Sequence, residues 1–130
     1  MHIHHVGYLV KRPDKAKESF ISIGFSVKQE SMYDQLRDVN ILFMEKDGYV
    51  IELVSPNSEK SVVAQLMKTY KNSPYHICYE SEYFDEDIKN LAKNGFMSID
   101  QPLPAPALDG RRVCFFMSPQ IGIIELLEGE

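Results

Sequence analysis

The feature that most constrains the fold is an internal repeat that spans most of the chain. His5-Val6-Gly7-Tyr8 recurs as His76-Ile77-Cys78-Tyr79, 71 residues further on. Gly24-Phe25 recurs at the same spacing as Gly95-Phe96. The two halves of the chain are therefore expected to form two modules of the same fold.

The repeat continues toward the end of each half, with a slightly longer spacing. Phe43-Met44 matches Phe116-Met117 at a spacing of 73 residues, and Val50-Ile51-Glu52-Leu53-Val54 matches Ile123-Ile124-Glu125-Leu126-Leu127 at the same spacing. We interpret the change as a net insertion of two residues between the glycine and the third strand of the second module. Four landmarks in one order are hard to obtain by chance.

Each module is predicted to contain a strand, a helix and three further strands. The first helix starts at Pro13-Asp14 and ends before Gly24, with Ala16, Phe20 and Ile23 on its inner face. Asp47-Gly48 is typical of a hairpin turn. The proline-rich segment 102–106 cannot donate a full ladder of hydrogen bonds and is expected to be a loop or a sheet edge. The other predicted strands are 3–10, 25–32, 40–44, 49–54, 75–80, 113–117 and 121–127, and the other helices are 61–70 and 84–94.

These elements predict an α+β fold of two tandem βαβββ modules within one domain, residues 1–130. The first module covers about residues 1–56, a linker helix about 57–72, and the second module about 73–130. The length is sufficient for a real hydrophobic core.

Composition restricts the class of protein and its partners. Hydrophobic residues make up 44% and charged residues 25%, the balance of a soluble globular protein. No apolar run reaches the roughly 20 residues that span a bilayer, and no signal peptide is expected at the N-terminus. Two cysteines favour a reducing cytoplasm, and a net charge of −5 argues against nucleic acid as a partner.

Four polar residues lie at repeated positions in apolar strands. Glu52 and Glu125 are each surrounded by aliphatic residues, and His5 and His76 begin the first strand of each module. A buried carboxylate needs a partner or a metal ion. Two imidazoles and two carboxylates form a mixed N/O set suited to Zn²⁺, Ni²⁺, Co²⁺ or Fe²⁺. The alternative is that the carboxylates point to solvent from a half-exposed sheet.

Three further sets of residues have both a functional and a structural interpretation. The repeat selects His5 as the ligand and leaves His2 and His4 as surface residues. Cys78 shares a strand face with His76, and we expect it to be a small core residue. Arg111 or Arg112 is a candidate for binding a carboxylate or phosphate of a substrate, and a solvent-exposed arginine at the start of a strand is the alternative.

These motifs resemble the vicinal oxygen chelate superfamily, which includes glyoxalase I, methylmalonyl-CoA epimerase, extradiol dioxygenases and bleomycin-resistance proteins. The resemblance covers nearly the whole chain. It implies a curled mixed sheet around a metal and substrate cavity, with His5, Glu52, His76 and Glu125 as the metal ligands. Zinc, nickel or cobalt is the ion implied, and a homodimer is the implied assembly.

The resemblance also implies a chemistry. Two His and two Glu ligands resemble bacterial glyoxalase I, whereas the segment around His5 is closer to the epimerases, which carry Gln at the Glu52 position. We therefore predict a lyase or isomerase of the glyoxalase I type, which removes a carbon-bound proton beside a metal-bound carbonyl and passes through an enediolate. Glu125 is the expected base, with Glu52 as ligand or second base, on a glutathione or CoA conjugate. The alternatives are an epimerase-like racemase and a non-catalytic protein that binds an antibiotic or toxin.

Overall fold

The computed structural model describes residues 1–130 and has the α+β fold that the sequence predicts. Its elements, in chain order, are β1 (His2–Leu9), α1 (Pro13–Ser22), β2 (Ser26–Asp34), β3 (Val39–Lys46), β4 (Tyr49–Pro56), α2 (Ala64–Tyr70), β5 (Ser73–Ser81), α3 (Phe84–Lys93), β6 (Met97–Ser98), β7 (Leu103–Pro104), the 3₁₀ helix η1 (Pro106–Leu108), β8 (Arg112–Ser118) and β9 (Gly122–Glu128). No helix is long and apolar enough to cross a membrane.

The chain divides into two compact units. The first unit is His5–Tyr75, and the second is His76–Glu130 together with Met1–His4. Both contain the elements of one predicted βαβββ module, and the first unit also contains the linker helix α2.

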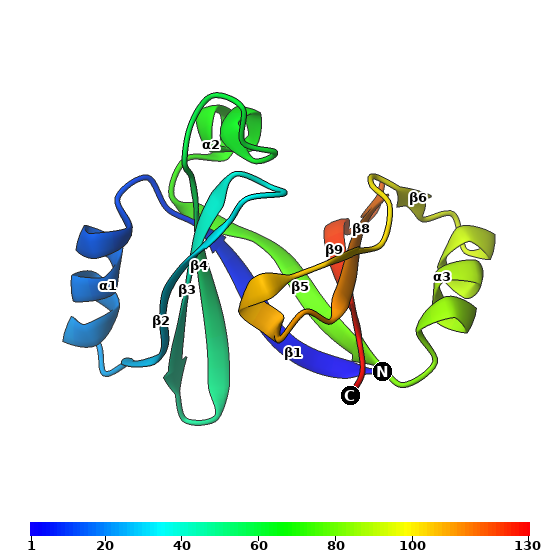
Figure 1. Ribbon diagram of the computed structural model, residues 1–130, viewed down its shortest axis with the longest axis horizontal. Helices are drawn as coiled ribbons and strands as arrows, with labels where there is room; N and C mark the ends of the chain where they lie inside the picture. The colour runs from blue at the N-terminus through cyan, green and yellow to red at the C-terminus, as the bar shows by residue number, and fades with distance from the viewer. The chain divides into compact units, whose positions relative to one another are not determined.

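In the first unit the strands are ordered β2-β3-β4-β1, with β1 parallel to β4 and the other neighbours antiparallel. Helix α1 packs on one face of this sheet, against β2, β3 and β4 (Figure 1). The sheet contributes the buried side chains of Leu42, Met44 and Leu53 to the core under this helix. The helix contributes Ala16 and Phe20, as predicted.

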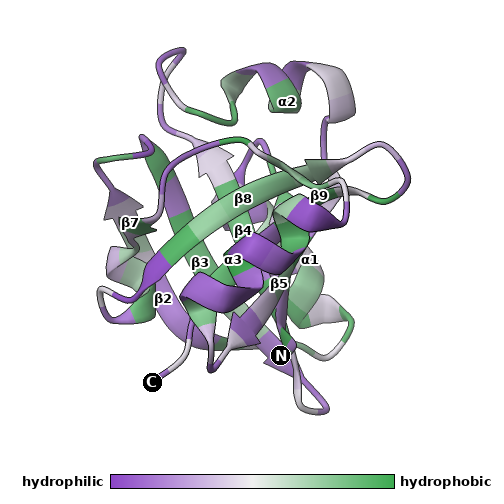
Figure 2. Cartoon of the chain, turned by 90° about the vertical axis from the view of Figure 1, so that its right-hand side faces the viewer, coloured by the Kyte–Doolittle hydropathy of each residue, from purple (hydrophilic) through white to green (hydrophobic).

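In the second unit the order is β5-β9-β8-β6, with β7 also paired to β8. Strand β5 runs parallel to β9, and the remaining neighbours are antiparallel. Helix α3 covers a core that contains Cys114, Phe116, Ile124 and Leu126. Figure 2 looks onto α3, where most residues are coloured as hydrophilic, whereas most of β8 is coloured as hydrophobic.

The strand registers correct one part of the repeat. The β3–β4 hairpin places Phe43 opposite Glu52, and the β8–β9 hairpin places Phe115 opposite Glu125. Phe43 therefore corresponds to Phe115, and the sequence match of Phe43 with Phe116 is wrong by one residue. The cores agree with this register, because Met44 and Phe116 both point under a helix.

The cause of the shift is the length of the two hairpin turns. In the first hairpin Lys46 pairs with Tyr49, so the turn is the dipeptide Asp47-Gly48. Both turn residues have positive φ, 54° and 82°, as a type I′ turn requires, and the predicted turn is confirmed. In the second hairpin Ser118 pairs with Gly122, which leaves three residues in the loop. One of the two inserted residues thus lies in this loop and not before the strand.

Two other predictions need correction. Ile23 lies beyond the end of α1 with 62% of its surface exposed, so it does not belong to the inner face. Helix α2 is shorter than the predicted segment 61–70 and begins at Ala64. The proline-rich segment lies at a sheet edge, where Leu103–Pro104 forms β7 and pairs only with β8.

Candidate metal site

The first unit holds one histidine and one glutamate in contact. His5 lies on β1 and Glu52 on β4, and their side chains are 0% and 6% exposed. The Nε2 atom of His5 is 3.5 Å from Oε1 of Glu52. Tyr8 and Leu53, which are paired across β1 and β4, point into the core under α1. His5 and Glu52 lie an odd number of residues from them along the same strands, so their side chains point to the opposite face.

The second unit repeats this pair. His76 on β5 and Glu125 on β9 have side chains that are 0% and 4% exposed. The Nε2 atom of His76 is 3.0 Å from Oε1 of Glu125. The alternative that these carboxylates point to solvent is wrong for both Glu52 and Glu125, which are buried.

The two pairs share the same strand register. Gly7 is the neighbour of Glu52 across the parallel strands β1 and β4, and His5 lies two residues before Gly7. Cys78 is the neighbour of Glu125 across β5 and β9, and His76 lies two residues before Cys78. The repeat in the sequence is therefore a repeat of side-chain geometry.

An aromatic ring lies against each imidazole, and sequence reasoning did not assign it this role. The Phe43 ring meets the His5 ring edge-to-face, with centroids 5.4 Å apart. The Phe115 ring meets the His76 ring in the same way at 5.3 Å. Such contacts restrict the rotation of the imidazole and keep its Nε2 directed at the carboxylate. Counting strand positions from the hairpin turn is the signal that identifies both rings.

The donor atoms of each pair fit two neighbouring positions on one metal ion. Two ligands about 2.1 Å from a metal, at 90–110° to each other, lie roughly 3.0–3.4 Å apart. The observed separations are 3.0 Å in one pair and 3.5 Å in the other. Imidazole nitrogen and carboxylate oxygen are suitable donors for zinc, nickel and cobalt. Each module thus holds a His/Glu pair able to bind a divalent ion.

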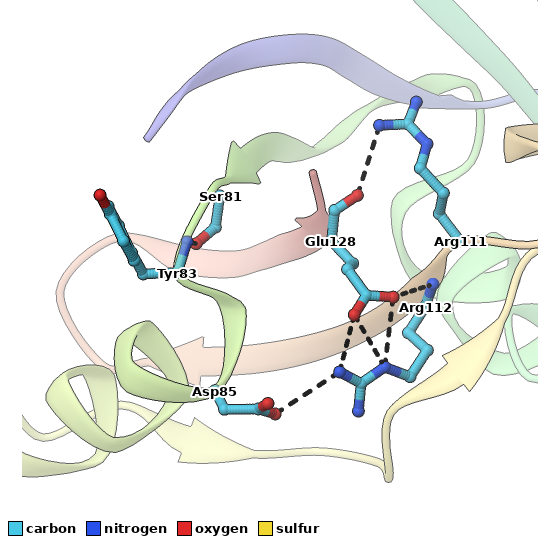
Figure 3. A network of polar contacts seen from close by, with 6 residues as sticks. All are labelled: Ser81, Tyr83, Asp85, Arg111, Arg112 and Glu128. Carbon is cyan, nitrogen blue, oxygen red and sulfur yellow. Dashed lines mark hydrogen bonds and ion pairs between the residues drawn. The ribbon is translucent and has the colours of Figure 1, made fainter. Parts of the chain in front are cut away.

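The two adjacent arginines point to opposite faces of the second unit's sheet, and Figure 3 shows their guanidinium groups on opposite sides of β8. Arg112 lies on the side of α3, where it pairs with Glu128 at 2.8 Å and stacks over the Phe84 ring at 4.8 Å. Arg111 pairs with Glu80 at 2.8 Å, and its side chain is only 16% exposed. Both arginines have ion-pair partners within the fold, in contrast to the alternative of an arginine that extends freely into solvent. That either one binds a substrate stays a prediction.

The remaining candidates are placed as follows. His2 is exposed, as predicted, and its Nε2 is 3.2 Å from Glu80. His4 is half-buried, so its prediction as a surface residue is only partly correct. Cys78 is fully buried, as expected. Burial, followed by the nearby carboxylates of Asp100 and Glu125, raises the pKa of the Cys114 thiol to about 12.

Comparison with known proteins assigns the family. Residues 4–115 match the Glyoxalase/Bleomycin resistance protein/Dioxygenase superfamily. The chain belongs to this superfamily, as its resemblance to the vicinal oxygen chelate proteins implies. No curated protein sequence matches the chain significantly.

Solved structures confirm the fold. The chain is similar to a hypothetical protein from Bacillus halodurans, with 23% identity, a TM-score of 0.84 and coverage of 98% of this chain and 94% of that one. It is also similar to methylmalonyl-CoA epimerase from Mycobacterium tuberculosis, with 20% identity, a TM-score of 0.83 and coverage of 99% and 88%. A methylmalonyl-CoA epimerase in complex with methylmalonyl-CoA and NH₄⁺ matches at 20% identity and a TM-score of 0.82, with coverage of 98% and 94%.

Proposed function

We propose that the protein is a divalent-metal-dependent lyase or isomerase that transfers a proton at a carbon next to a carbonyl group. The proposal rests on the duplicated, buried His–Glu pair, found in the same register in both modules. A protein that only sequesters a small molecule has no need of two buried carboxylates beside imidazoles, because each carboxylate is costly to bury.

The proposed metal site combines His5, Glu52, His76 and Glu125 around one ion. Each pair supplies two donors, whereas zinc takes at least four ligands and can expand to five, so one pair alone leaves the coordination incomplete and both pairs together still leave a position for a substrate oxygen. The two pairs have equivalent donors and similar spacings, as expected of two halves of one ligand set. When bound, a divalent ion acts as a Lewis acid toward a carbonyl oxygen and makes the neighbouring C–H group more acidic.

The protein's own residues perform the proton transfer in this proposal. Glu125 is the base: its carboxylate takes the proton from the carbon, and the electron pair of that C–H bond remains on the substrate. The protonated carboxyl then returns the proton to the same face of that carbon, which restores its configuration, or to the neighbouring carbon, which isomerises the substrate. Inversion requires a proton from the opposite face, where a protonated Glu52 would donate it. Glu52 is a ligand or a second base on the opposite face. Phe43 and Phe115 hold the two imidazoles in position.

The substrate class favoured is an acyl-CoA thioester. The support is that methylmalonyl-CoA epimerases recur among the similar structures, one of them with methylmalonyl-CoA bound. The second candidate is a glutathione hemithioacetal, as for glyoxalase I. Its support is the carboxylate of Glu52, which gives this chain two His and two Glu donors.

The test is deuterium incorporation from D₂O into the substrate. Protein stripped of metal and reloaded with zinc, nickel or cobalt is incubated with methylmalonyl-CoA, or with the hemithioacetal of methylglyoxal and glutathione. Mass spectrometry follows deuterium at the acidic carbon of the thioester, and product formation follows the hemithioacetal. Glu125→Gln is expected to slow the reaction about 10²–10⁴-fold, the usual contribution of a general base.

Glu128→Gln is the matched control. It lies on the same strand but on the opposite face, paired with Arg112, so exchange should be retained. Metal-dependent exchange that Glu125→Gln removes supports the proposal. Tight metal binding without exchange of either substrate would contradict it and favour a binding protein.

A further inference from the structure

Side chains along β5, β8 and β9 alternate between the two faces of the second unit's sheet. His76, Cys78 and Glu80 follow at alternate positions on β5 and therefore share one face. Glu125 is paired with Cys78, so it belongs to this face as well. The opposite face carries Cys114, Phe116 and the core under α3.

Arg112 belongs to the face of α3 and is fully engaged there. Its Nε and Nη2 atoms donate to the Glu128 carboxylate, and Nη2 also lies 3.6 Å from Asp85. Its guanidinium plane lies over the Phe84 ring. Arg112 thus fastens the start of α3 to the end of the sheet.

Arg111 belongs to the face of His76 and Glu125, because its partner there is Glu80. The Nη1 atom donates to Oε2 of Glu80 at 2.8 Å and to the carbonyl of Glu128 at 3.3 Å. The Nε atom donates to the carbonyl of Leu108 at 3.4 Å. These contacts fix the guanidinium group, while both N–H groups of Nη2 make no hydrogen bond to the protein.

The position of this group relative to Glu125 follows from the register. Glu80 is paired with Leu127, and Cys78 is paired with Glu125. Two residues along a strand correspond to about 6.6 Å, so the Glu80–Arg111 pair lies one side-chain row beyond Glu125 on the same face. His2 holds the other oxygen of Glu80 at 3.2 Å, so this carboxylate is supported from two sides.

We propose that Arg111 is a specificity-determining residue whose free Nη2 binds a carboxylate on the acyl portion of the substrate. A guanidinium group is a strong carboxylate partner because its N–H donors match the two oxygens. One oxygen of the Glu80 carboxylate already accepts a hydrogen bond from Nη1 of this group. The inference rests on the proposed function, which supplies the acyl thioester as the substrate class. It adds that the acyl group carries a carboxylate and that Arg111 binds it.

The experiment compares matched thioesters that differ only in this carboxylate. Malonyl-, succinyl- and glutaryl-CoA are titrated calorimetrically into the zinc-loaded full chain, each against propionyl-, butyryl- or pentanoyl-CoA of the same chain length. The phosphates of CoA are common to each pair and cancel. In the wild type, at least one carboxylated thioester is expected to bind about 10-fold or more tightly than its partner.

Arg111→Gln should abolish this preference without changing the affinity for the thioesters that lack the acyl carboxylate. Arg112→Gln is the control on the opposite face and should retain it. If Arg111→Gln does not fold, Arg111→Lys is expected to fold and to weaken the preference, because lysine lacks the planar fork. No preference in the wild type, or an unchanged preference in Arg111→Gln, overturns the assignment.

The outcomes also separate this inference from the proposed function. A preference that depends on Arg111 in a protein that exchanges no deuterium supports the carboxylate site and contradicts the catalytic proposal. Exchange that requires Glu125, without any preference that depends on Arg111, supports the catalytic proposal and overturns the role of Arg111.

Discussion

If one metal ion binds both His–Glu pairs, the two pairs should contribute equally to the stability that the metal adds. The perturbations are Glu52→Leu and Glu125→Leu, which roughly keep the size of each buried side chain and remove its charge and its oxygen donors. A metal ion that binds only the folded state stabilises it by RT ln(1 + [M]/Kd), or about 2.7 kcal/mol at a free concentration of 100 Kd. For 130 residues the entropy of unfolding is about 0.27 kcal/mol/K, so the wild-type Tm should rise by about 10 °C.

Loss of one ligand is expected to reduce this shift in both variants. Removing even an indirect partner of a metal ligand costs about 10–100-fold in affinity, and removal of a ligand should cost at least as much. A 100-fold loss at the same free metal concentration leaves RT ln 2, about 0.4 kcal/mol, which corresponds to about 1.5 °C. The assay is differential scanning calorimetry in a metal buffer that fixes the free concentrations of zinc, nickel and cobalt in turn.

The two variants must behave alike for the reasoning to hold. Their Tm values without metal provide the control, since a fold damaged by the substitution shows itself there. A shift that remains near 10 °C in Glu52→Leu but vanishes in Glu125→Leu would show that the ion binds the second pair alone. No shift in the wild type with any of the three metals would refute the site.

Three further predictions address the fold. Leu53→Ala and Leu126→Ala remove equivalent buried side chains from the two cores, and each should lower the free energy of unfolding by about 2.7–5 kcal/mol in urea titrations; a loss below about 1 kcal/mol in either would contradict the core assignment. Hydrogen bonds from Arg112 lower the pKa of the Glu128 carboxyl below its ordinary value of 4.5, so this pair stabilises the fold above pH 4.5 and loses its effect as the pH falls through the lowered pKa. The difference in Tm between wild type and Arg112→Gln should therefore narrow below pH 4.5. A Tm difference that does not change with pH would contradict the contribution of the Glu128 pKa to stability. With a pKa of about 12, the Cys114 thiol should resist iodoacetamide at pH 8.5 in the native protein and react in urea, as mass spectrometry of the labelled peptide can show.

Sequence reasoning succeeded where a residue type permits few conformations. Asp47-Gly48 fixes a two-residue turn because both positions need positive φ, and Pro13 fixes the start of α1. The His–Glu pairs could be found because a carboxylate amid aliphatic residues, repeated with its histidine, is hard to explain without a partner. Their contact within each module could not be measured from the sequence, since it depends on the parallel pairing of strands that are distant in the chain.

The errors arose where neighbouring residues have the same character. Phe115 and Phe116 are both aromatic, so the repeat could be aligned in two ways, and only the loop length of the second hairpin decides between them. Arg111 and Arg112 are likewise identical in type, and strand parity assigns one to the face of Glu125 and the other to the face of α3. The edge strand of the second module is reduced to β6 and β7, because the prolines between and beside them interrupt the hydrogen-bond ladder.

The unequal hairpin turns bear on how the modules could be exchanged or redesigned. Deleting one residue from the loop 119–121 would leave a two-residue turn, as in the first hairpin, and Ser118 would still pair with Gly122. Phe115 would then remain opposite Glu125, and Phe116 would remain under α3. Duplicated halves of a protein can thus diverge in length within a loop while the pairing of the strands on either side is unchanged.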